Sequence, residues 1–203
     1  MSAIPITPQA LPGTPDDQPW HLPYRGKVGM YSLIVGESAI FIIFVIAYVY
    51  YIGKNLSGPT PQQVLEVPII NSIALLSSSL TIWLAERNLE HKKMKAFAAW
   101  WGLTALLGLY FLIGTAIEWH TLIYEKGLTI STNLFGTTFY SLVGLHASHV
   151  IFGLIGLTTV LIFTLTGHVK EEHANKIETL ALYWHFVDAI WIVVFTVVYI
   201  IGR

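Results

Sequence analysis

Five apolar runs, each long enough to cross a lipid bilayer, restrict the folds open to this sequence. A helix rises about 1.5 Å per residue, so about 20 apolar residues cross the hydrocarbon core. A helix also satisfies its own backbone hydrogen bonds, which lipid cannot do. We therefore expect an all-α integral membrane bundle in a single domain, residues 28–203, after an irregular tail, residues 1–27. The five transmembrane helices are predicted at 28–52, 67–85, 96–117, 136–166 and 180–201.

Composition supports a membrane protein and excludes several functional classes. Only 11% of the residues are charged, against about 25% in a typical soluble domain. The formal net charge is −1, so nothing indicates a nucleic-acid partner. The chain has no cysteine, which excludes disulfides, thiolate nucleophiles and iron–sulfur clusters. Any metal would need His and carboxylate ligands.

The distribution of Lys and Arg predicts the orientation of the helices, because basic residues concentrate in cytoplasmic loops. Eight of the eleven fall in the tail and in the loops after the second and fourth predicted helices, which share one side of the membrane, and three fall on the other side. We therefore expect a cytoplasmic N-terminus and an external C-terminus. The eight are Arg25, Lys27, Arg87, Lys92, Lys93, Lys95, Lys170 and Lys176, and the three are Lys54, Lys126 and Arg203.

Polar groups within the apolar runs are the candidate functional residues. Glu37 lies in the first run, and Asp188 lies at a similar depth in the last. His185 precedes Asp188 by three residues and so shares its helix face, within reach of an imidazole–carboxylate hydrogen bond. His146 and His149 repeat this spacing in the fourth run.

Two interpretations of these groups are open. Intramembrane carboxylates and histidines can relay protons, but they can also hydrogen-bond across helices and serve only packing. For His185 with Asp188, and for His146 with His149, we favour packing. For Glu37 we favour a functional or regulatory role, because the residues near it at helical spacing are aromatic and offer few partners. These residues are Phe41, Phe44 and Tyr48.

A bound metal or haem is the less favoured use of the histidines. His146 and His149 can share one metal, with His185 as a third ligand. They cannot supply both axial ligands of one haem, because they approach from the same side. Gly144 and Ser148 have a simpler expected role, as a strip of small residues against which another helix packs closely.

Several segments together resemble subunit III of the haem–copper respiratory oxidases. Trp184-His185-Phe186-Val187-Asp188 followed by Trp191 resembles the terminal signature of that family. Gly36-Glu37, Leu65-Glu66-Val67-Pro68 with Asn71, Gly136-Thr137-Thr138-Phe139 and Gly144-Leu145-His146-Ala147-Ser148-His149-Val150 agree with it in order. The family often has Ser where this chain has Gly36, and Gly where it has Ala147. Neither difference removes a functional group.

The resemblance implies an accessory, non-redox subunit of an aerobic terminal oxidase. Such a subunit packs directly against subunit I, which holds the haems and copper, and assembles with subunit II; it stabilises the catalytic subunit and supports proton uptake. The complex reduces oxygen to water and translocates protons across the bacterial plasma membrane. A cytochrome c oxidase is favoured over a quinol oxidase. Other respiratory-chain components and membrane lipids are further expected partners.

Length sets this chain apart from the longer members of that family. Those members have seven helices, and this chain begins at the equivalent of their third, as the short bacterial forms do. It therefore lacks the helix pair that forms one wall of a lipid-holding cleft, which leaves a bound phospholipid an open question.

Two further functions are open on the sequence alone. The first is a subunit associated with a nitric oxide reductase, within the same family. The second, from a different class, is a stand-alone haem-binding or proton-coupled membrane carrier that uses the three histidines and two carboxyl groups of the apolar runs.

Overall fold

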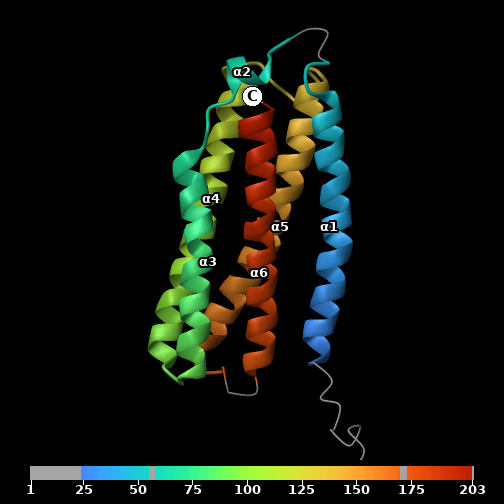
Figure 1. Ribbon diagram of the computed structural model, residues 1–203. Coiled ribbons are helices and arrows are strands. Elements are labelled where there is room, and N and C mark those ends of the chain that lie inside the picture. The colour runs from blue at the N-terminus through green and yellow to red at the C-terminus, as the bar shows by residue number, and fades with distance from the viewer. Residues whose placement is uncertain (1–23, 55–57, 170–172, 203) are drawn as a thin grey trace, which may run out of the picture.

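The chain forms a bundle of long helices, as its apolar runs predict (Figure 1). The computed structural model describes residues 24–54, 58–169 and 173–202, and this part of the chain contains no β-strand. The helices are α1 (Arg25–Tyr51), α2 (Pro61–Val64), α3 (Ile69–Glu90), α4 (Met94–Tyr124), α5 (Leu134–Leu165) and α6 (Ala174–Phe195), which continues as the π-helical segment η2 (Thr196–Ile201). Five of them are long and apolar enough to cross a membrane, and the short α2 lies in the connection after α1.

The helices pack in a row that α6 closes. α3 packs on α4, α4 on α5, and α5 on α1, while α6 contacts α1, α3 and α5. α1, α4 and α6 begin, and α3 and α5 end, at one end of the bundle, the bottom of Figure 1. We call this the basic end, because seven basic residues lie there and only Lys54 and Lys126 lie at the opposite end of the described chain. The seven are Arg25, Lys27, Arg87, Lys92, Lys93, Lys95 and Lys176.

The helices extend beyond the apolar runs at most ends. α3 continues through Glu90, where a loop from Glu86 was predicted, and α6 starts at Ala174 instead of residue 180. α4 continues to Tyr124, past the predicted end at residue 117. An apolar run marks the part of a helix that suits lipid, whereas the helix itself can continue through charged residues that reach water.

The predicted irregular tail, residues 1–27, is wrong at its end and otherwise lies outside the described residues. α1 already begins at Arg25. Its first turn is held by Lys27, whose Nζ lies 2.5 Å from Glu178 Oε2 on α6. Lys170 and Arg203, which entered the orientation prediction, also lie outside the described residues.

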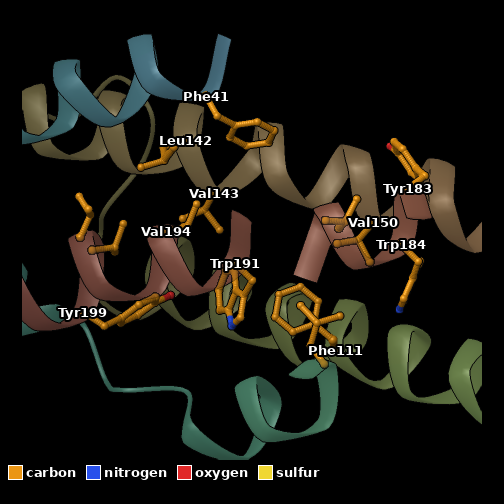
Figure 2. Close-up of a cluster of buried hydrophobic side chains, with 14 of the residues drawn as sticks. Phe41, Phe111, Leu142, Val143, Val150, Tyr183, Trp184, Trp191, Val194 and Tyr199 are labelled. Carbon is orange, nitrogen blue, oxygen red and sulfur yellow. The ribbon is translucent and has the colours of Figure 1, made fainter. Parts of the chain in front are cut away.

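Large aromatic side chains fill the core between the helices. Figure 2 shows Phe111 and Trp191 pointing toward each other; their ring centroids are 4.7 Å apart. Two of the buried indole nitrogens bond to polar groups of other helices: Trp101 Nε1 donates to Leu157 O at 2.9 Å, and Trp191 Nε1 donates to Ser72 Oγ at 3.1 Å. The outward faces of the long helices instead expose aliphatic side chains such as Val35 and Ile70, which suits a bundle solvated by lipid.

Candidate functional site: buried polar groups of the helix bundle

Glu37 on α1 and His149 on α5 form a polar pair between two helices. His149 Nε2 lies 3.1 Å from Glu37 Oε2, and the two side chains are 25% exposed for Glu37 and 11% for His149. The other ring nitrogen, Nδ1, lies 2.8 Å from the backbone oxygen of Leu145. Phe41, one turn after Glu37, covers the imidazole with its ring centroid 5.0 Å away.

These contacts fix how many protons the pair holds. A carbonyl oxygen only accepts hydrogen bonds, so His149 Nδ1 carries a hydrogen and donates to Leu145. The contact between Nε2 and Glu37 then holds one proton, carried by the carboxyl or by the imidazole. The pair is neutral overall in either form, which lowers the cost of placing it in a membrane. The sequence predicted few partners for Glu37 on its own helix face; the partner comes from α5.

Asp188 on α6 faces α3 and is almost completely buried, with 2% of its surface exposed. Its Oδ2 accepts hydrogen bonds from Ser79 and, at 3.3 Å, from Ser78. Ser78 Oγ in turn accepts a hydrogen bond from Trp184 Nε1 at 2.8 Å. These two serines are the hydrogen-bond donors to this carboxyl group.

His185 shares the helix face of Asp188, as its spacing predicts, but the two side chains are joined through α3. His185 Nδ1 lies 3.3 Å from Ser79 Oγ, and Ser79 bonds Asp188. The second nitrogen, Nε2, lies 3.8 Å from Glu86 Oε2 near the end of α3. Ser79 thus takes the place of the direct imidazole–carboxylate hydrogen bond that the three-residue spacing suggested.

His146 and His149 diverge although they share a helix. The His146 ring stacks on Trp191 with ring centroids 5.0 Å apart, and the edge contact with Phe111 has centroids 5.8 Å apart. Its surface is 0% exposed. His146 therefore faces α4 and α6, whereas His149 faces α1.

His146, His149 and His185 do not gather around one shared metal position. Both ring nitrogens of His149 bond to protein groups, and Nδ1 of His185 contacts Ser79. In the described part of the chain there is no group of three or more His, Cys, Asp or Glu arranged to hold a metal ion. The shared metal that was the less favoured use of His146, His149 and His185 does not fit this arrangement.

Glycines let Trp184 insert between helices. A Cβ at Gly108 of α4 would lie 2.6 Å from the Trp184 ring, and a Cβ at Gly153 of α5 would lie 2.7 Å from it. Gly144 has a looser contact, since its Cβ would lie 3.3 Å from the ring of Trp119. Ser148 donates to Leu145 O of its own helix at 2.6 Å. The close approach of Trp184 is thus made at Gly108 and Gly153, beyond the strip of Gly144 and Ser148 that the sequence singled out.

Glu118 on α4 is a partly buried carboxyl group that the sequence analysis missed. Tyr199 of η2 donates a hydrogen bond to Glu118 Oε1 at 2.9 Å. The predicted helix stopped at Ile117, which placed this carboxyl group in a loop. Leu122 and Ile123, at helical spacing beyond it, were the signal that the amphipathic helix continues.

Comparison with known proteins agrees with this architecture. Residues 24–203 match the family model for cytochrome c oxidase subunit III. The chain is 34% identical to a cytochrome c oxidase subunit 3 of Alkalihalophilus pseudofirmus over 100% of this chain and 98% of that protein. It is 31% identical to that of Bacillus subtilis, over 97% and 96% of the two chains.

A quinol oxidase relative is similar to nearly the same extent. The chain is 30% identical to a probable quinol oxidase subunit 3 of Staphylococcus saprophyticus, over 92% of this chain and 94% of that protein. The family match covers every long helix and both polar clusters described above. The chain therefore belongs to the cytochrome c oxidase subunit III family and is an accessory subunit of a terminal oxidase.

Proposed function

We propose that the chain packs directly against subunit I of a cytochrome c oxidase in the bacterial plasma membrane and also assembles with subunit II. Two of the three relatives described above carry the name cytochrome c oxidase subunit 3, and this favours cytochrome c over quinol as the electron donor. In this proposal the haems and copper belong to the partner subunits, and other respiratory-chain components and membrane lipids, a phospholipid included, are further partners.

Within that complex the chain stabilises the catalytic subunit and supports proton uptake. The observation that carries the second role is the contact between His149 Nε2 and Glu37 Oε2, 3.1 Å long and placed between two membrane helices. The proton in this contact can sit on the carboxyl group or on the imidazole, and both groups are able to give up or take up a proton. This is the property that a group near a proton-uptake route needs.

Purification by a tag on this chain tests the proposed assembly. We expect a large haem-bearing polypeptide to copurify, and the complex to consume oxygen faster with reduced cytochrome c than with quinol. Faster turnover with quinol would reassign the donor. The chain would also be separated from its partners and its absorbance spectrum recorded. A stoichiometric haem band in that spectrum would contradict the accessory role and support the alternative of a stand-alone haem-binding carrier.

A further inference from the structure

A surface cavity at the basic end is lined in part by His185. The cavity has a volume of about 500 Å³ and lies between the start of α1, the end of α3 and the first turns of α6. These three helix ends lie at the bottom of Figure 1. The charged and titratable side chains that line it include Lys27, Glu86, Arg87, Glu90, Glu178 and His185. Both signs of charge are present, so the cavity is suited to water and to proton exchange.

His185 joins this cavity to the buried carboxyl group. Its side chain is 37% exposed, whereas Asp188 is 2% exposed. Ser79 donates its hydroxyl hydrogen to Asp188 Oδ2, so its oxygen is free to accept the hydrogen on His185 Nδ1, 3.3 Å away. The donors therefore point in one direction, from His185 through Ser79 to Asp188.

We propose that Asp188 exchanges a proton with water in the cavity through Ser79 and His185. A proton from water binds His185 Nε2. The Nδ1 proton then passes to Ser79 Oγ while the hydroxyl proton of Ser79 passes to Asp188 Oδ2. His185 is left neutral with its hydrogen on Nε2, and the carboxylate has become a carboxylic acid. One proton has moved inward, and the same steps in reverse release it.

A comparison with Ser78, the neighbouring serine, distinguishes a proton route through Ser79 from a purely structural role of its hydroxyl group. Ser78 also donates to Asp188 Oδ2, but its oxygen accepts from Trp184 Nε1, which is not an acid–base group. Loss of either serine removes a donor to Asp188, whereas only loss of Ser79 breaks the connection to His185. The other ionisable groups in the middle of the helices packed against α6 are Glu37, His146 and His149, whose contacts are made with groups other than Asp188.

This inference extends the proposed role in proton uptake. It rests on that proposal, because the exchange is measured in the assembled oxidase. In the assembled oxidase, the infrared carbonyl band of protonated Asp188 would be followed after transfer from H₂O to D₂O. The band is assigned by its loss in Asp188→Asn, or by its displacement in Asp188→Glu where the Asn variant does not assemble. We expect Ser79→Ala and His185→Phe each to slow the deuterium shift on the order of 100-fold, the size of effect that a positioned proton donor has.

Two serines on the same helix provide matched controls. Ser78→Ala removes a donor to Asp188, and Ser77→Ala removes a hydroxyl that bonds only its own helix, at Ala74 O. Both should exchange at the parent rate. The proposal is overturned if Ser79→Ala and His185→Phe also exchange at that rate, if Ser78→Ala slows exchange as much as Ser79→Ala, or if no Asp188 acid band appears at any pH at which the complex is intact. Proton uptake by the same variants, measured in parallel, tests the proposed function separately.

Discussion

At the scale of single residues, Glu37 and His149 are important because two groups share one proton. Glu37→Gln keeps an N–H that can donate to His149 Nε2, so the helix contact survives, but the amide cannot take up or release a proton. We expect normal assembly of the complex and proton uptake slowed by about tenfold, equivalent to about 1.4 kcal/mol in the barrier. Proton uptake by the purified complex after reduction is the measurement.

Ser38→Ala is the control for the Glu37 substitution. The Ser38 hydroxyl bonds its own helix at Ile34 O, 2.6 Å away, so its loss changes the same stretch of α1 without touching His149. If Glu37→Gln matches both Ser38→Ala and the parent in proton uptake and in loss of activity during turnover, Glu37 serves only helix packing.

Asp188 also has a structural role, which substitution by an apolar residue tests. Asp188→Leu leaves the hydroxyl groups of Ser78 and Ser79 without their acceptor in a buried contact between α3 and α6. An unsatisfied buried polar group costs about 1–3 kcal/mol. We expect a lower yield of assembled complex and a lower melting temperature, measured by size-exclusion chromatography and thermal unfolding.

Val193→Leu is the matched control for Asp188→Leu. It places the same side chain on the exposed face of α6 and should leave the complex at the parent's yield. Equal yields for the two variants would show that the contact of Asp188 with α3 does not contribute to assembly.

At the scale of elements, Trp184 fixes α6 against two helices at once. Its ring fills the space that side chains would need at Gly108 and Gly153, and its indole nitrogen bonds Ser78. Gly153→Leu forces this rigid ring away from α5, and overpacking of this kind costs about 1–3 kcal/mol. We expect a lower melting temperature of the complex. Gly29→Leu on α1, where no atom lies within 4 Å of an added Cβ, should not lower it; an equal loss in both variants would contradict the packing role.

The existence of the long helices was predictable from the sequence, while their ends and contacts were not. An apolar run reports the lipid-facing length, so the charged turn after Glu86 and the partly buried Glu118 were assigned to loops. Helical spacing placed His185 and Asp188 on one face, because that is a local property. It could not show that Glu37 meets His149, since the pairing of α1 with α5 depends on how the whole bundle packs.

At the scale of the whole molecule, the distribution of basic residues predicts the orientation in the membrane. Seven basic residues lie at the basic end of the described chain and two lie at the opposite end, so we expect the basic end to face the cytoplasm. Labelling of cysteines introduced at Lys92 and Lys54, with a reagent that cannot cross the membrane, is the measurement. Only the Lys54→Cys variant should be modified in intact cells, and modification of Lys92→Cys alone would reverse the orientation.

The position of α6 has a consequence for how the protein is made. The ribosome synthesises this helix after α1, α3, α4 and α5, and it contacts α1, α3 and α5. A nascent chain that stops before Ala174 has serines 72, 78 and 79 of α3 without Trp191, Trp184 and Asp188 as partners. Until α6 packs against α3, these three hydroxyl groups form a polar stripe on α3 that lacks its partners.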